Sequence, residues 1–193
     1  MDLDSPLIVV VSGTYGVGKT SLAFSLSQRL RIKQSAGLGV ISRVLSFIEK
    51  TNPTISDWGN YKDCKDEQGV IDKLHKEAAI AGGVISSIVE KAKLTGAPYI
   101  IDGVQLLPDY LPMNDILFIP LTLLDEVEHR KRFLTPDTTK VRHLDNVSFL
   151  NVRLIDREIV RSARQHAVEV INSQIPEDEI ANHIIKTHNL YPT

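Results

Sequence analysis

The sequence predicts an α/β fold in which helices cover both faces of a parallel sheet. Apolar runs of strand length alternate with amphipathic stretches of helix length along the chain. The first run, Leu7–Val11, is continuously apolar, as expected for a strand that is buried on both faces. A glycine-rich segment, 13–18, joins this run directly to the first helical pattern.

The first strand is followed by a helix and then by a second strand–helix pattern. Apolar residues recur at helical spacing from Ser21 to Leu30, and a short second strand is predicted at 32–36. The next helix opens at 37–39 and ends near Asn52-Pro53, which is a breaker pair. Its apolar face is formed by Val40, Ile41, Val44, Leu45 and Ile48. We expect the following stretch, Thr54–Lys65, to be an irregular loop.

A long helix is predicted from about Asp66 to Leu94. The pair Gly82-Gly83 in its middle disfavours a helix by about 1 kcal/mol per glycine. Either the helix breaks there, or another segment packs closely against it. Gly96 near its end suits a helix C-cap, and the third strand follows at Tyr99–Asp102.

The remaining chain completes the alternation. We predict strands at Ile116–Leu121 and Ala167–Ile171, and helices at Asp125–Leu134, Ser148–Gln165 and Pro176–Lys186. The polar segment 134–147, which is rich in Thr and Asp and is interrupted by a proline, is predicted to be a mobile lid. Residues 1–193 are expected to form a single domain.

Composition excludes several classes of protein. Hydrophobic residues make up 42% and charged residues 24%, which is typical of a globular protein. The net charge of −2 makes nucleic acid a less favoured partner, reachable only through a local basic patch. Leu7–Val11 is too short to span a bilayer, so no membrane partner is expected. Cys64 is the only cysteine, which excludes an intrachain disulfide and favours a reducing, cytoplasmic setting. The sequence does not indicate an oligomeric state.

The stretch Gly13–Thr20 reads GTYGVGKT and fits G-x-x-x-x-G-K-[ST], a loop that wraps nucleotide phosphates. Its glycines allow successive backbone N–H groups to form an anion nest at a helix N-terminus. Lys19 would reach the β- and γ-phosphate oxygens of ATP, and the Thr20 hydroxyl would ligate Mg²⁺. The alternative is a glycine turn that binds nothing. The predicted nucleotide-binding residues are Gly13, Thr14, Tyr15, Gly16, Val17, Gly18, Lys19, Thr20 and Ser21.

Other polar residues are expected at the carboxyl edge of the sheet, where ligands bind in such folds. Asp102 ends an apolar strand, and it either holds Mg²⁺, directly or through water, or caps the next turn. Gln105 would then face an acceptor substrate. Trp58 and Tyr61 either wall the acceptor pocket or anchor their loop.

Basic residues cluster after the fourth predicted strand. Because phosphoryl transfer spreads negative charge over the moving group, arginine side chains at this position would stabilise it. Arg132 and Arg142 are predicted to act in catalysis and Arg153 in substrate binding. The alternative is a set of solvated helix faces. The whole cluster is His129, Arg130, Lys131, Arg132, Lys140, Arg142, His143, Arg153 and Arg157.

Four stretches of the chain, in order, resemble the archaeal 2-phosphoglycerate kinases: residues 13–20, 99–108, 125–133 and 149–156. The resemblance implies a three-layer P-loop kinase fold with five parallel strands in the order 2-3-1-4-5. It also implies an ATP- and Mg²⁺-dependent kinase that transfers the γ-phosphoryl group to a small hydroxyl compound or phospho-acid.

The chain departs from the family pattern on the acceptor side. The family's Thr-Asp pair, whose Asp is the expected contact for the acceptor hydroxyl, is replaced by Leu38-Gly39. The family's Glu and His in the phrase EGVH are replaced by Asp102 and Gln105, and an arginine is missing near Thr135. Asp102 and, less directly, Asp57 are candidate general bases. The alternatives are a nucleoside, nucleotide or RNA 5′-hydroxyl kinase, and a non-catalytic ATP-binding regulator.

Overall fold

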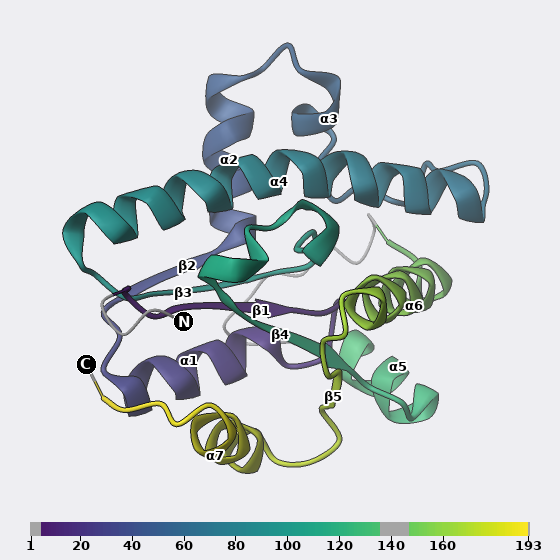
Figure 1. Ribbon diagram of the computed structural model, residues 1–193. Coiled ribbons are helices and arrows are strands. Elements are labelled where there is room, and N and C mark those ends of the chain that lie inside the picture. The colour runs from purple at the N-terminus through teal and green to yellow at the C-terminus, as the bar shows by residue number, and fades with distance from the viewer. Residues whose placement is uncertain (1–4, 136–146, 193) are drawn as a thin grey trace.

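A parallel five-stranded sheet of order β2-β3-β1-β4-β5 forms the centre of the molecule (Figure 1). The computed structural model describes residues 5–135 and 147–192. The strands are β1 (Ile8–Ser12), β2 (Gln34–Gly37), β3 (Tyr99–Gly103), β4 (Leu117–Thr122) and β5 (Ile171–Asn172). Both the parallel sheet and the strand order implied by the resemblance are confirmed.

β1 lies at the middle of the sheet, and all five of its residues are buried. Its neighbours β3 and β4 run parallel to it, so the carboxyl ends of the three strands meet at one edge. In this register Val11 lies opposite Asp102, and Asp102 lies opposite Gly37 at the end of β2. The segment after β1, the end of β3 and the start of the helix after β2 therefore converge.

Helices cover both faces of the sheet (Figure 1). α1 (Lys19–Leu30) and α7 (Glu177–Thr187) lie together on one face and bury Val9 and Val11 of β1. α4 (Glu67–Thr95) and α6 (Phe149–Gln165) lie on the other face. α5 (Glu126–Leu134) follows β4. The short 3₁₀ turns Pro108–Tyr110 and Met113–Asp115 connect β3 to β4.

α4 continues without a break through Gly82-Gly83. A Cβ atom at Gly82 would lie 2.3 Å from the Tyr110 carbonyl oxygen, whereas one at Gly83 would meet nothing within 4 Å. Of the two sequence alternatives, close packing is therefore confirmed, and only Gly82 requires it.

α2 (Leu38–Ile48) and α3 (Pro53–Ser56) extend beyond α4 in Figure 1. The predicted apolar stripe of α2 is helical in spacing, but most of it faces outward. Three of its five residues, Val40, Val44 and Ile48, are more than half exposed, and Ile41 is partly buried against the core. The buried residues of α2 are Leu38 and Ser42. Helical periodicity identified the element and not the side that packs. α3 also corrects the prediction that all of Thr54–Lys65 is irregular, because its first residues are helical.

Two strand predictions were displaced. β2 begins at Gln34 and not at Ile32. Arg31, in the αL conformation, ends α1, and Ile32 directly after it is buried in the core without belonging to the strand. β5 comprises only Ile171 and Asn172, whereas 167–171 was predicted. Val168 and Val170 pack against the core on the α4 side without pairing as strand residues, so their apolar character reflects burial alone. Within the two described ranges, no helix is long and apolar enough to cross a membrane.

Candidate active site

The phosphate loop lies between β1 and α1, as predicted. Gly16 and Gly18 have φ angles of 83° and 90°, a region that glycine enters without steric cost. Gly18 is the N-cap of α1, and no side chain caps the helix. A helix N-terminus of this kind is suited to an anionic ligand, which the helix dipole also favours.

Side chains on both sides hold the loop in place. Ser12 Oγ, just before it, donates to the Leu106 carbonyl at 2.6 Å, and Thr14 Oγ1 donates to the Val152 carbonyl of α6 at 3.2 Å. Lys19 Nζ donates to the Thr14 carbonyl at 2.6 Å, so its charge lies against the loop. The ammonium group predicted to reach phosphate oxygens is therefore positioned beside the nest.

Thr20 and Asp102 meet at the edge of this nest. The Thr20 hydroxyl donates to Asp102 Oδ2 at 2.7 Å, although the two residues lie 82 positions apart in the chain. A hydroxyl and a carboxylate are hard oxygen ligands of the kind that Mg²⁺ takes together with phosphate oxygens and water. The described residues contain no cluster of three or more His, Cys, Asp or Glu side chains suited to a metal. These residues thus fit a Mg²⁺ ion that is shared with a nucleotide.

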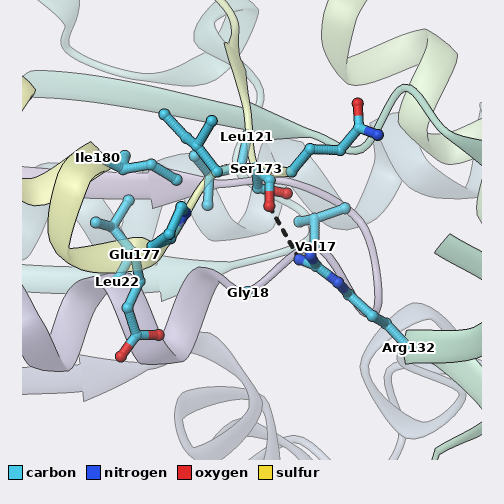
Figure 2. A pocket seen from close by; sticks show the side chains of 11 residues that line it. Val17, Gly18, Leu22, Leu121, Arg132, Ser173, Glu177 and Ile180 are labelled. Atoms are coloured by element: carbon cyan, nitrogen blue, oxygen red, sulfur yellow. Dashed lines mark hydrogen bonds between the residues drawn. The ribbon is translucent and has the colours of Figure 1, made fainter. Parts of the chain in front are cut away.

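A cavity of about 310 Å³ opens beside the loop (Figure 2). Val17, Gly18 and Leu22 line one side, and the segment Ser173–Glu177 lines the other. Arg132 reaches across the cavity, where its Nη1 donates to the Ser173 carbonyl at 2.9 Å and its Nε to Glu128 at 2.9 Å. The lining of the cavity is mixed, with apolar Val17 and Leu22 on one side and polar groups that include the planar Arg132 guanidinium on the other, and a guanidinium can stack on a flat aromatic base.

Sequence reasoning placed the segment after Ile171 at the carboxyl edge of the sheet, where ligands bind, but named none of residues Ser173–Glu177 as ligand contacts. The only signal was that the segment follows the last strand and must return to the carboxyl edge of the sheet. Asn172, Ser173 and Gln174 match no nucleotide motif, so only the tertiary contact with the phosphate loop identifies this side of the cavity.

The predicted acceptor residues are not held in the same way. Gly39 is exposed in the first turn of α2, and an added Cβ would have no neighbour within 4 Å. This turn lies close to Asp102, because the strand β2 that precedes it ends at Gly37, where an added Cβ would lie 3.5 Å from Asp102 Oδ1. Trp58 is half-buried and packs against the apolar core below α4.

Gln105, predicted to face an acceptor, is buried and directed into a polar cluster with Tyr61 and Glu77. Gln105 Nε2 donates to Glu77 Oε2 at 2.9 Å, and the Tyr61 hydroxyl donates to the same oxygen at 2.5 Å. The backbone N–H of Gly59 donates to Glu77 Oε1 at 2.8 Å. Burial raises the pKa of Glu77. Tyr61 is therefore an anchor of the 57–61 segment, and Gln105 positions the same segment.

Arg153, predicted to contact substrate, lies behind the phosphate loop. Its Nη1 donates to the Leu123 carbonyl at 2.8 Å and lies 2.9 Å from His129 Nδ1 and 3.4 Å from Asp156 Oδ2. His129, grouped with the cations by sequence, is fully buried. Burial lowers the pKa of His129, and the charge of Arg153 acts in the same direction.

The remaining predictions concern Asp57, Arg142 and the lid. Asp57 is paired with Lys73 at 2.6 Å. Desolvation alone would raise the pKa of Asp57, but hydrogen bonds from Lys73 and Asn60 outweigh it and lower this pKa. Asp57 is therefore a weaker proton acceptor than an ordinary aspartate. Arg142 and most of the predicted lid, 136–146, lie outside the described residues, and both stay predictions.

Comparison with curated proteins confirms the resemblance to archaeal 2-phosphoglycerate kinases. The chain is 25% identical to the 2-phosphoglycerate kinase of Methanocaldococcus jannaschii and 28% identical to that of Methanococcus maripaludis. These matches cover 87% and 86% of this chain and 59% of each relative. The chain thus spans about three-fifths of the length of these relatives. No family model matches the chain.

Comparison with solved structures shows the P-loop kinase fold. Shikimate kinase from Acinetobacter baumannii, in complex with shikimate, superposes with a TM-score of 0.55 at 13% identity, over 96% of this chain and 94% of that chain. A deoxyadenosine kinase from M. mycoides gives a TM-score of 0.51 at 11% identity, over 95% and 99% of the two chains. At such identities the comparison concerns the fold alone.

Proposed function

We propose that this chain is an ATP- and Mg²⁺-dependent kinase that transfers the γ-phosphoryl group to a small acidic acceptor such as 2-phosphoglycerate. The contact between Thr20 and Asp102 carries the proposal, because it unites a hydroxyl and a carboxylate at a helix N-terminus that has no side-chain cap. A structural turn would need neither the uncapped helix nor the paired oxygen ligands. The names of the sequence relatives support the acceptor class.

Each residue of the nucleotide half has a defined role in this proposal. Backbone N–H groups of residues 13–21 bind the phosphates, and Lys19 neutralises the transferring charge. Thr20 and Asp102 hold Mg²⁺, which when bound would neutralise charge on the β- and γ-phosphate oxygens. Arg132 borders the base, and Arg142 would add positive charge from the lid of a single P-loop kinase domain. The reducing cytoplasm is the setting expected for such an enzyme.

The acceptor would bind between Asp102, the first turn of α2 at Gly39, and Trp58. Asp102 is our candidate general base, provided that it holds Mg²⁺ mainly through water, since its Oδ1 would lie 3.5 Å from a Cβ at Gly37, just before this turn. Gln105 and Arg153 support the site without contacting the acceptor, because the described contacts commit both side chains elsewhere.

Calorimetric titration with ATP·Mg²⁺, followed by ADP-release assays, tests the proposal. We expect binding of ATP and turnover with 2-phosphoglycerate or a related hydroxy acid. The same assay should include shikimate, deoxyadenosine and an RNA 5′-hydroxyl end. ATP binding without turnover on any of these acceptors would favour a non-catalytic regulator. The lack of a carboxylate at Gly39, where the resembling family has Asp, would agree with that outcome. Failure to bind ATP would overturn the proposal.

Asp102→Asn tests whether Asp102, together with Thr20, holds Mg²⁺. The amide preserves the size of the side chain and removes the charge that attracts Mg²⁺. We expect the Mg²⁺ concentration for half-maximal turnover to rise by about 10–100-fold. Asp115→Asn, which removes a surface carboxylate paired with Lys93, is the matched control and should leave the Mg²⁺ dependence unchanged. An unchanged Mg²⁺ requirement in Asp102→Asn would remove this residue from the metal site.

A further inference from the structure

Two side chains form a bridge behind the phosphate loop that the proposed catalytic roles do not use. His129 of α5 places Nε2 at 2.8 Å from the Tyr15 carbonyl oxygen in the loop. Arg153 of α6 places Nη1 at 2.9 Å from Nδ1 of the same ring. The imidazole is fully buried, and it contacts the edge or face of the Phe149 ring at 5.4 Å between centroids.

These contacts determine the protonation state of His129. A guanidinium only donates hydrogen bonds, so Nδ1 must accept from Arg153 and carries no proton. Nε2 must then carry the proton and donate it to the Tyr15 carbonyl. The charges around the ring act in the same sense: Arg153, Lys19 and Arg132 are all cationic and disfavour an imidazolium. Asp156, the acidic group nearby, faces Thr122 and Arg153.

The hydrogen bond to Tyr15 also orients the next amide. A trans peptide is planar, and its C=O and N–H point in opposite directions. The described chain has no cis peptide bond. Holding the Tyr15 carbonyl towards His129 therefore directs the Gly16 N–H away from His129, which keeps this N–H available to a nest of amides around a phosphate. A rotated peptide would present the carbonyl oxygen to the phosphates and repel them.

The bridge joins three separate parts of the chain at one point. Arg153 also donates to the Leu123 carbonyl just after β4, which fixes its guanidinium against the sheet. Thr14 is tied to Val152, the residue before Arg153, at 3.2 Å. A Cβ at Gly16 would lie 3.2 Å from the Phe133 nitrogen of α5. The loop, α5 and α6 are thus packed so closely that a flipped Tyr15–Gly16 peptide would disturb all three.

We propose that His129 and Arg153 are positioning residues for the phosphate loop. Arg153 selects the Nε2–H form of His129, and His129 holds the Tyr15–Gly16 peptide with its N–H directed at the nucleotide phosphates. This inference rests on the proposed function, because the ligand that benefits is the phosphate tail of ATP. It assigns to two residues of the basic cluster a role in which neither touches the substrate.

The first test needs no ligand. Nitrogen-15 NMR of the imidazole at neutral pH distinguishes a protonated from an unprotonated ring nitrogen. We expect His129 to show a protonated Nε2 and an unprotonated Nδ1. In Arg153→Met the Nε2 proton should stay hydrogen-bonded to the Tyr15 carbonyl, but Nδ1 should gain its proton at a higher pH than in the native protein, because its donor and a neighbouring positive charge are lost. A ring protonated at Nδ1, or at both nitrogens, in the native protein would overturn the inference whatever the enzyme does.

The second test measures the affinity for ATP·Mg²⁺ in two variants. His129→Leu removes the donor to Tyr15 and should weaken ATP binding by about tenfold, the effect of one hydrogen bond of ordinary strength. His129→Gln keeps one donor and one acceptor in an amide that does not titrate, so it should bind within about threefold of the native affinity. Rescue by glutamine separates positioning from simple loss of packing.

His75 provides the matched control. It also bridges two partners, with Nδ1 at 2.9 Å from the Tyr110 hydroxyl and Nε2 at 2.7 Å from Glu158, but neither partner belongs to the loop. His75→Leu should lower the unfolding temperature without changing the ATP affinity. Native affinity in His129→Leu would overturn the positioning role and leave the kinase proposal intact. Absence of ATP binding in the native protein would overturn the kinase proposal, and this inference with it.

Discussion

The phosphate loop and the start of α2 lie on either side of Asp102, and they are built differently. The loop is tied to its surroundings through Thr14 and Tyr15, each with a partner on another helix within 3.2 Å, and Lys19 donates back to the Thr14 carbonyl within the loop. Gly39 in α2 has open space around it, and Val40 beyond it is 69% exposed. If the proposed function holds, contacts with the core fix the nucleotide half of the site, while a few exposed positions are left to determine the acceptor.

Lys19→Ala should give the largest effect on the nucleotide side. A preorganised charge at the transferring group is removed, so turnover should fall by at least ~10²-fold. The fold should persist, because Lys19 Nζ donates to the Thr14 carbonyl within the loop and does not enter the apolar core. ADP release and circular dichroism measure the two properties. The exposed Lys76 provides the control, Lys76→Ala, and native turnover in Lys19→Ala would contradict the proposed site.

Gly82→Ala and Gly83→Ala test whether α4 is packed as tightly against its neighbour Tyr110 as the phosphate loop is against its own neighbours. The new methyl group at Gly82 collides with the Tyr110 backbone, so the free energy of unfolding should fall by about 1–3 kcal/mol. At Gly83 the methyl group meets open space, and better helix propensity should raise it by about 0.5–1 kcal/mol. Urea unfolding measures both. Equal changes in the two variants would show that α4 does not pack as described.

The buried His129 should make the nucleotide side sensitive to acid. Because burial lowers its pKa in the folded protein, the unfolded chain binds more protons between that lowered value and about 6.5. The free energy of unfolding should therefore fall as pH drops below about 6.5 and should be unaffected by this group above it. The raised pKa values of Glu77 and Asp156 act in the opposite sense: the folded protein binds their protons more tightly, so these two groups make the free energy of unfolding fall as pH rises through their titration.

Comparison with His129→Gln isolates this contribution from the two carboxyl groups, which both proteins share. Urea titrations at about pH 7.5 and about pH 5.5 bracket the titration of an ordinary histidine. The native protein should lose more stability between these values than the variant does. An equal loss in the two proteins would show that His129 is not held neutral by its surroundings.

Gly39→Asp should have the smallest effect, and it tests the acceptor side. The side chain has room, and an acidic group in the first turn of α2 should stabilise the protein by about 0.3–1 kcal/mol through the helix dipole. It also restores the carboxylate of the resembling family, so turnover with a glycerate-like acid should rise a few-fold. No gain with any acid acceptor would argue against the acceptor position assigned to Gly39.

The sequence alone determined the α/β class, the nucleotide loop and most element positions. Periodicity and motif spacing are local properties, so Leu7–Val11 and Gly13–Thr20 could be interpreted without knowing their neighbours. Periodicity did not predict which segments pack or pair with each other: most of the apolar stripe of α2 faces outward, and β5 pairs over only two residues.

Only the tertiary structure decided which polar side chains meet. Thr20 meets Asp102 because β1 and β3 are adjacent in register, whereas Gln105 turns to Glu77 and Arg153 to His129. A charged residue on a helix has the same sequence signature whether it is solvated, buried in a pair or directed at a ligand. The free energy that separates these states comes from burial and from partners that are distant in the chain, and so it appears only once the chain is folded.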